Sequence, residues 1–502
     1  PWTKLAGYYP MSTFTYKNTI DASGNGAHGT LKNISSVDKQ TAPLPYKSIQ
    51  KGEWDKKETW TNGSMQYIPG SRSIVDPDIT IDWNIVKTSH LVTMDNSHLP
   101  TENKANRKIL GLYIDANELV LKGNTNTNEG NGLTISHYLN LTGKIDLEGE
   151  SQLIQELNSD LDVASSGVLE QDQQGPSDMF TYKYWSSPVG KTDIANNEYS
   201  YSVKDIMYDG IQPINFITSG YDGAATSPIG IADYWIWKYA NQINNNYSSW
   251  QHIKRTGTIN AGEGFTMKGP GTGSLSTDQN YVFSGKPNNG NIDLTIHANN
   301  DYLVGNPYAS AIDANQFIID NGPSNTESLP TISGTLYFWK HWGGNSHFLN
   351  SYQGGYATYN FSGGVAAASY GTNDPFIATG GLPTQIPRRH IPVGQGFFVV
   401  GKNTGTINFN NGQRIFEKEK KIVPTVLAND GSSQVQASYN SEEGDNRMKF
   451  RIGFKSINTI HRQLLLTIDE NASPEVDWAY DAKRIESQMD DMYWMINEDP
   501  YI

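Results

Sequence analysis

The sequence contains no cysteine among its 502 residues. This absence excludes disulfides, thiolate nucleophiles, cysteine-ligated zinc and iron–sulfur clusters. Charged residues are also few, at 18%, and no stretch approaches the roughly 20 apolar residues that a membrane-spanning helix requires. A chain of this size must therefore be stabilised by hydrophobic cores, and its length predicts several of them.

Basic residues are scarcer than acidic ones. The chain has 38 Lys and Arg against 52 Asp and Glu, which leaves a formal net charge of −14. Nucleic-acid binding depends on a basic surface that neutralises phosphates, so we expect no nucleic acid partner. An anionic membrane surface would repel the chain for the same reason.

Aromatic residues and glycine are plentiful. Aromatics reach 11% of the sequence, with 28 Tyr and 12 Trp, and there are 48 Gly. Aromatic side chains pack well on the pleated surface of a sheet, and glycines serve the tight turns between strands. The composition therefore predicts an all-β fold.

Apolar residues recur about every 20 residues between 52 and 175. The recurring residues are Leu91, Leu112, Leu133 and Leu153, at steps of 21, 21 and 20, and the pairs Leu119/Leu121, Leu139/Leu141 and Leu161/Val163. A spacing of two within each pair predicts short strands with one face on a core. Such a repeat predicts a β-solenoid-like stalk, whose coils bury their apolar faces by stacking.

Two aromatic-rich blocks follow, at 176–298 and 299–416, and they share the same series of motifs. The first contains YKYWSSPVG, DYWIWK, AGEGFTMKG and YVFSGK, and the second contains DYLVGNPYASAID, LYFWK, VGQGFFVVG and INFNNGQRIF. Motifs in one order predict an internal duplication. We expect two β-sandwich-like domains in tandem.

The Gly-x-Gly-Phe motifs of the two blocks could be mistaken for phosphate-binding loops. A dinucleotide-binding loop must open a helix, and a P-loop ends in Gly-Lys-Ser/Thr. Here strand-like residues follow, Phe265–Met267 in one block and Phe397–Val400 in the other. The motifs therefore predict a tight turn or bulge from which a Phe-led strand enters a core.

The remaining segments complete the predicted domain organisation. Residues 1–51 form a loop-rich N-terminal segment, the stalk covers 52–175, and 417–447 is a polar linker. Residues 448–502 would be the start of a C-terminal β-domain. We expect the sequence to be a piece of a longer polypeptide.

No catalytic, cofactor-binding or metal-binding residues are predicted. The sequence has no HExxH zinc motif and no credible nucleophile elbow. Asp233, Glu263 and Asp313 lie beside aromatic residues, as glycosidase carboxylates would, but that chemistry requires a carboxylate separation that a sequence cannot supply. Gln395 replaces Glu263 in the second block, so the two blocks need not share a role for this charge. We expect a non-enzymatic protein.

Trp250 in NYSSWQH and Trp342 in KHWGGN are candidates for stacking on sugars, because they lie in polar loops rich in Asn and Gly. The alternative is that loop rings cover a core of aromatic side chains. That core would contain Trp185, Trp235, Trp237 and Trp339.

Several motifs together resemble a known group of proteins. They are TAPLPY, GEWDKKETWTNG, KIDLEGESQLIQ, YKYWSSPVG, DYLVGNPYASAIDANQFI, IPVGQGFFVVG and HRQLLLTIDENASPEVDWAYDA. In this order they are similar to the C-terminal region of large cell-surface proteins that Bacteroidota, especially flavobacteria, export by the type 9 secretion system. The resemblance spans about Thr41 to Tyr501.

The resemblance implies a protein exported across the outer membrane to the cell surface. Its partners would be the type 9 translocon and associated outer-membrane proteins, and its role adhesion or gliding motility. Members usually carry a small C-terminal sorting domain, which we expect to lie beyond Ile502. Binding or processing of surface glycans is the alternative function.

Overall fold

The computed structural model describes residues 6–9, 18–33, 45–61, 68–72, 76, 78–95, 106–197, 199–244, 246–324, 329–343, 345–370, 386–419, 445–457 and 460–502. The prediction of an all-β fold is confirmed. Strands dominate the described chain, with two short α-helices, α1 (Val203–Ile206) and α2 (Ala314–Asp320). A small hairpin, β1 (Asn18–Thr19) with β2 (Gly29–Thr30), precedes the main body.

The first block consists of two sheets in which consecutive parallel strands alternate, and we call it the parallel block. One sheet contains β3 (Tyr46–Lys47), β5 (Ile85–Thr88), β7 (Arg107–Ile114), β9 (Gly132–Leu141), β11 (Gln152–Gln155) and β12 (Asp160–Leu161). The other contains β4 (Gly52–Glu53), β6 (Val92–Met94), β8 (Glu118–Leu121), β10 (Lys144–Leu147) and β13 (Val168–Pro176). From β3 to β11 the chain thus adds one strand to each sheet in turn, and β12 then joins the same sheet as β11.

Apolar side chains form ladders that run across neighbouring strands of the parallel block. Val92, Leu119, Ile145 and Leu169 are successive partners and all are fully buried. They lie 27, 26 and 24 residues apart in the chain, so the predicted step of 20 to 21 residues is wrong for this ladder. The prediction was wrong because each coil contributes two similar apolar strands, one to each sheet. The apolar spacing in the sequence therefore compares strands that are not partners. Leu112 accordingly pairs with Leu139 and not with Leu133.

Two glycines allow the coils to stack closely at one corner. A Cβ atom on Gly167 would lie 2.0 Å from the carbonyl oxygen of Gly143, and one on Gly143 would lie 2.4 Å from that of Asn117. No side chain fits at such distances, so these turns need glycine.

The parallel block and the first of the two similar blocks share a sheet. Strand β13 pairs in parallel with β10 and antiparallel with β24 (Asp278–Pro287), which continues to β16 (Met207–Asp209) and β17 (Gln212–Pro213). β15 (Val189–Gly190) also pairs with β24. The sheet therefore passes from one block into the next without a break in its hydrogen bonding.

Several smaller pairs complete the region around residues 182–268. They are β14 (Tyr182–Trp185) with β23 (Phe265–Lys268), β18 (Asn215–Ile217) with β19 (Gly230–Ala232), and β20 (Trp237–Lys238) with β22 (Gln251–His252). Short 3-10 turns connect them, including η4 (Asp233–Trp235) and η5 (Tyr247–Ser249).

The second similar block is built on a six-stranded sheet. Its order is β21 (Gln242–Ile243), β26 (Asn300–Gly305), β33 (Gly396–Val400), β28 (Leu336–Gly343), β29 (Gln353–Asn360) and β30 (Gly363–Val365). Beside it lie the pair β25 (Ile292–Ile296) and β34 (Gly405–Phe409), and the trio β32 (His390–Ile391), β27 (Ala311–Asp313) and β35 (Arg414–Ile415). The C-terminal strands are β31 (Ser369–Tyr370), β36 (Lys449–Lys455), β37 (Ile460–Thr467), β38 (Trp494–Ile496) and β39 (Asp499–Tyr501).

The Gly-x-Gly-Phe motifs begin strands in both blocks, as predicted. Gly262 and Gly394 have φ values of 83° and 66°, the left-handed conformation that glycine adopts freely. The phenylalanines that follow, Phe265 and Phe397, are fully buried. Phe265 pairs with Trp185, and Phe397 pairs with Val304, so the motif has one register in both blocks.

The two blocks also exchange hydrogen bonds at these motifs. The Ser186 N–H donates to the Gly394 carbonyl at 2.8 Å, and the Gly305 N–H donates to the Gly262 carbonyl at 3.0 Å. Ser186 and Gly305 occupy the same place in their motifs, as do Gly394 and Gly262. The contact is therefore reciprocal, like an isologous interface within one chain.

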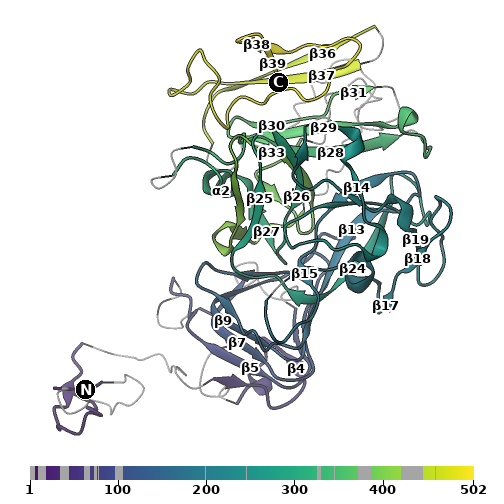
Figure 1. The fold of residues 1–502 in the computed structure, drawn as a ribbon. Coiled ribbons are helices and arrows are strands. Elements are labelled where there is room, and N and C mark those ends of the chain that lie inside the picture. The colour runs from purple at the N-terminus through teal and green to yellow at the C-terminus, as the bar shows by residue number, and fades with distance from the viewer. Residues whose placement is uncertain are drawn as a thin grey trace, which may run out of the picture.

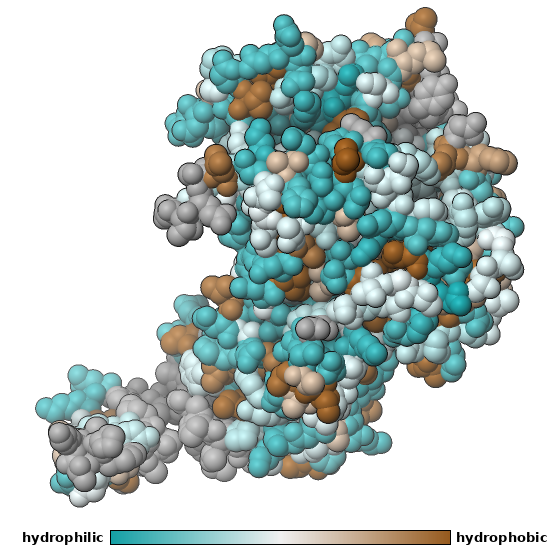
Figure 2. Space-filling view, in the orientation of Figure 1, coloured by the Kyte–Doolittle hydropathy of each residue, from teal (hydrophilic) through white to brown (hydrophobic). Residues whose placement is uncertain are grey.

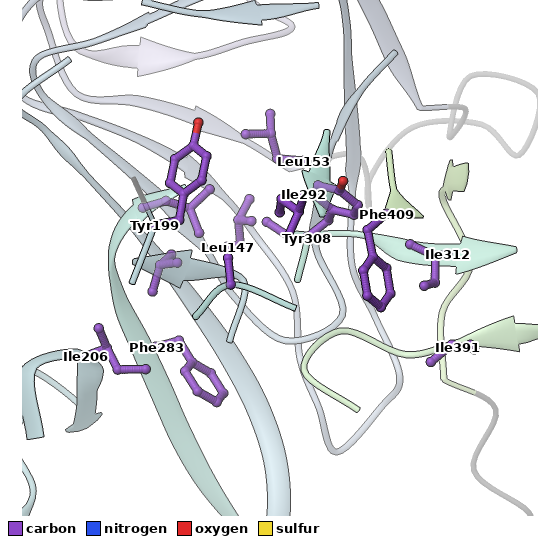
Figure 3. Close-up of a cluster of buried hydrophobic side chains, with 14 of the residues drawn as sticks. Leu147, Leu153, Tyr199, Ile206, Phe283, Ile292, Tyr308, Ile312, Ile391 and Phe409 are labelled. Carbon is purple, nitrogen blue, oxygen red and sulfur yellow. The ribbon is translucent and has the colours of Figure 1, made fainter. Parts of the chain in front are cut away.

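One hydrophobic core runs through the three blocks. Figure 3 shows Leu147 and Leu153 of the parallel block beside Tyr199, Phe283 and Ile292 of the first similar block and Tyr308 and Phe409 of the second. In Figure 1 the parallel block lies at the bottom and strands β36 to β39 at the top, with the two similar blocks between them. The described body is thus elongated but continuously packed.

Candidate functional site

Aromatic rings lie side by side where the two similar blocks meet, and we call them the aromatic belt. The belt comprises Tyr182, Tyr184, Trp235, Trp250, Trp339, His341, Tyr352 and Tyr356, and each ring contacts another ring of the belt or shares the cation of Lys268. Within the described chain this group is the best candidate for a site.

Strand alternation explains why these rings share one face. Tyr182 and Tyr184 are two residues apart on β14, as Trp339 and His341 are on β28, and such residues point to the same side. The rings of Tyr182 and Trp339 stack with centroids 5.5 Å apart and planes 4° apart. Gly354 makes room for this stack, because a Cβ there would lie 2.4 Å from the Trp339 ring.

A buried lysine lies in the middle of the belt. Lys268 on β23 is directly opposite Tyr182 in the ladder and is only 2% exposed. Its Nζ lies 3.6 Å from the ring centroid of Trp235 and 4.8 Å from that of Tyr352, and it donates to the Tyr352 hydroxyl at 2.6 Å. Burial lowers the pKa of Lys268 to about 7, although Asp178 and Asp222 act in the opposite direction.

His347 joins the two similar blocks at this lysine. It lies between β28 and β29, and its ring stacks on Trp235 with centroids 5.0 Å apart. Its Nε2 lies 2.8 Å from Oδ1 of Asp222, and its Nδ1 lies 3.0 Å from Lys268 Nζ. The contacts fit a neutral ring that donates from Nε2 and accepts at Nδ1. His347 of the second block therefore contacts Trp235, Asp222 and Lys268 of the first.

His341 is a second buried histidine of the belt. Burial lowers its pKa to about 4, with the Gly343 carbonyl acting against the shift. Its Nε2 donates to that carbonyl at 2.8 Å. At neutral pH this ring is therefore an uncharged member of the stack.

The belt ends at the surface in four further rings, Tyr221, Tyr234, Trp237 and His252, which we call the outer cluster. Tyr234 is at its centre and meets Tyr221, Trp237 and His252 edge to face, with centroids 4.8, 6.0 and 5.2 Å away. Trp237 and His252 stack with centroids 4.0 Å apart and planes 10° apart, as cross-strand partners of β20 and β22. Tyr221 is 53% and Tyr234 36% exposed.

The structure describes the side chain of one of the two predicted sugar-stacking residues, Trp250. Trp250 is half-buried, and its ring contacts Tyr184, Tyr239 and Phe398 at centroid distances of 6.2, 5.3 and 5.9 Å. Trp342 is in β28, but its side chain lies outside the described residues. Sugar stacking by these residues stays a prediction, and Trp250 serves as cover for the core below it.

The tryptophans assigned to a core in the alternative interpretation divide into two groups. Trp185 is fully buried. Trp235, Trp237 and Trp339 are half-buried, so each keeps part of its ring at or near the surface.

The three candidate carboxylates each have basic or backbone partners. Asp233 pairs with Arg255 at 2.5 Å. Asp313 caps helix α2 by accepting from the Asn315 N–H, and it pairs with Arg389 at 2.6 Å. These contacts account for the two charges structurally.

Glu263 and Gln395 differ because their surroundings differ. Glu263 is 3% exposed, pairs with Lys238 at 2.8 Å, and accepts from the Tyr302 hydroxyl at 2.8 Å. The Gln395 side chain instead donates a hydrogen bond to the carbonyl of Gly396 at 2.7 Å. A buried carboxylate needs a positive partner, and Lys238 supplies it to Glu263.

Sequence reasoning missed Lys268 and the outer cluster. Lys268 is the last residue of the strand in AGEGFTMKG, where a lysine looks like an ordinary exposed strand end. The outer cluster had a visible signal in DYWIWK, since three aromatic residues within four positions exceed what one face of a strand can bury.

The space-filling view is consistent with binding by local groups rather than by a broad apolar surface. On the face seen in Figure 2, hydrophobic residues gather in small separate groups among hydrophilic ones. Within the described residues, no three His, Asp or Glu side chains are placed to hold a metal ion. No helix in the described part has the length and apolarity needed to cross a membrane.

The fold and the belt thus define an all-β protein with an aromatic junction between two similar blocks. The family described as Domain of unknown function (DUF8693) matches residues 217–502, more than half of the chain, and the chain belongs to this family. No curated protein and no solved structure matches the chain. The family match begins inside the first similar block and includes the outer cluster.

Proposed function

We propose that the chain is a rigid, non-enzymatic spacer of a cell-surface protein, serving attachment or gliding motility. The proposal rests on strand β13, which is hydrogen-bonded both to β10 of the parallel block and to β24 of the first similar block. A hinge needs a segment with few contacts, and this junction has a continuous sheet instead.

A second junction supports the same function. Arg414 of the second similar block is buried, donates to the Leu153 carbonyl of the parallel block at 2.7 Å, and lies with its guanidinium carbon 4.8 Å from the Tyr308 ring centroid. Gln152 of the parallel block accepts from the Ala311 N–H at 3.0 Å. The parallel block is thus joined to both similar blocks.

The proposal includes the architecture expected from the sequence. The apolar ladders and the alternation between two parallel sheets support a β-solenoid-like stalk. The common register of the two Gly-x-Gly-Phe motifs and their reciprocal bonds support a tandem duplication of one β-unit. Stacked coils and interlocked units both suit a part that must transmit force or keep other parts apart.

Distance measurement across the junction tests the spacer. The chain has no cysteine, so Asn126→Cys with Lys402→Cys places spin labels at two exposed positions, one in the parallel block and one in the second similar block. We expect one narrow distance distribution. Asn126→Cys with Thr142→Cys, both in the parallel block, gives the width contributed by the labels alone.

A distribution much broader than this control would refute the rigid spacer. Adding Gln152→Ala and Arg414→Met should broaden the cross-junction distribution while leaving the control pair unchanged. That pair of results would show that the junction contacts cause the rigidity.

Export by the type 9 secretion system, with its translocon as partner, is the proposed route to the surface. The resemblance of the motifs to exported surface proteins of Bacteroidota supports it. Protease treatment of intact cells should cleave the protein in the parent strain and not in a translocon deletion strain. Equal cleavage in both strains would contradict this route.

Carbohydrate binding is a second candidate function, and the aromatic belt favours it. The half-buried ring of Trp235 in the belt contacts Tyr221 and Tyr234 of the exposed outer cluster. Flat aromatic faces bind the apolar C–H faces of sugar rings, while the polar edges of tyrosine and histidine meet hydroxyl groups. A glycan array with the complete chain tests whether it binds sugars at all.

A further inference from the structure

The outer cluster consists of aromatic rings only. Its members are two tyrosines, a tryptophan and a histidine. Each of these rings pairs a flat apolar face with a polar edge. A partner that matches it must present apolar faces and hydroxyl groups together.

The indoles below the exposed rings are held in fixed orientations. The Trp235 Nε1–H donates to the Tyr221 carbonyl at 2.7 Å, and the Trp237 Nε1–H donates to the Tyr234 carbonyl at 2.6 Å. His252 stacks on Trp237 from the neighbouring strand. The cluster is therefore arranged before any ligand arrives, which reduces the entropy lost on binding.

The charge of the chain and of the groups near the outer cluster indicates which class of ligand it could bind. The chain carries a net charge of −14, and the Asp222 carboxylate beside the cluster has a side chain that is 67% exposed. Burial and the nearby Lys254 both lower the pKa of His252, which favours its uncharged ring. Anionic polymers are thus disfavoured, and Asp222 can accept hydrogen bonds from hydroxyl groups.

We propose that Tyr221, Tyr234 and His252 form a binding platform for neutral oligosaccharides. Pyranose rings would stack on the exposed rings, with their hydroxyls donating to Asp222 and exchanging hydrogen bonds with His252. This inference rests on the carbohydrate-binding candidate above and replaces Trp250 and Trp342 as the residues that would make the contact.

The geometry also explains why Trp250 is a poor test residue. Its ring covers Tyr184, Tyr239 and Phe398, so Trp250→Ala would open a cavity in the belt and confound lost binding with lost packing. The side chains of Tyr221 and Tyr234 are exposed, and their carbonyls would still hold the indoles after truncation. Tyr221→Ala and Tyr234→Ala should therefore fold normally.

The test uses neutral glycans that bind the complete wild-type chain on an array, followed by titration calorimetry with the strongest of them. Each alanine variant should weaken binding at least tenfold, while Tyr234→Phe should stay within about threefold because it keeps the ring. Tyr493→Ala is the matched control, since Tyr493 is an exposed tyrosine, 40% accessible, in the C-terminal segment. Circular dichroism should be the same for all variants.

The outcomes separate the platform from the broader function. Binding that survives in Tyr221→Ala and Tyr234→Ala would overturn the platform and leave carbohydrate binding standing. Equal loss in Tyr493→Ala would also overturn it, because the effect would not be local. Failure of the folded wild-type chain to bind any glycan would overturn both, as would a preference for polypeptide ligands at the same rings.

Discussion

Lys268 allows a quantitative test of how the belt treats a buried charge. Burial lowers its pKa to about 7, whereas the same side chain in an unfolded segment titrates near its model value of 10.5. Between these two values the unfolded state binds a proton that the folded state does not. The local stability should therefore rise with pH across this window.

The size of the effect follows from the two pKa values. One proton of difference corresponds to about 1.4 kcal/mol per pH unit, and allowing for partial protonation at both ends leaves about 2 kcal/mol between pH 7 and 9. Asp178 and Asp222 oppose the shift, and the charged form also contacts the face of Trp235 at 3.6 Å and the hydroxyl of Tyr352 at 2.6 Å. A desolvated cation–π contact stabilises the charged form by about 2 kcal/mol, which is less than the cost of burying an ammonium group.

Hydrogen exchange of the β23 amides measures this local stability. Lys268→Met removes the titrating group, so the stability of the variant minus that of the wild type should fall by about 2 kcal/mol from pH 7 to 9. Lys402→Met is the control, because Lys402 is exposed and its replacement should give a difference that does not change with pH. A flat difference for Lys268→Met would refute the reasoning. It would mean that Trp235 and Tyr352 fully compensate the burial of the charge.

Four further predictions follow from the structure. Ile145→Ala should lower the unfolding free energy of the parallel block by about 2 to 5 kcal/mol in urea denaturation, because it leaves a cavity in a fully buried ladder. Arg414→Met should increase hydrogen exchange on both sides of the junction, since the Leu153 carbonyl loses its donor at 2.7 Å; unchanged exchange would exclude a clamping role. Gly354→Ala should lower the melting temperature, because its Cβ would lie 2.4 Å from the Trp339 ring, whereas a melting temperature equal to wild type would show that the ring moves freely. Burial raises the pKa of Asp146 to about 7, so its contribution to stability is lost as pH rises from about 4 to 7; Asp146→Asn should gain stability relative to wild type over that range, and a constant difference would contradict it.

The period-two alternation of the strands could be predicted from the sequence. Leu119 and Leu121, or Leu139 and Leu141, indicate strands because alternation is a local property of the extended backbone. The all-β class and the turns at Gly262 and Gly394 follow from equally local signals. Local patterns do not specify which strand lies beside which, and this is why the 20-residue spacing gave the wrong partner for Leu112.

The candidate site depended on long-range packing. Lys268 and Glu263 are ordinary charged residues in the sequence, and only the fold buries them, one between aromatic rings and the other beside Lys238. His347 reaches Lys268 only because the second similar block docks on the first. The sequence by itself thus determined the strands, their turns and the likeness of the two blocks. The tertiary structure decided which charged side chains are buried and which aromatic rings remain exposed, because burial depends on neighbours that are distant along the chain.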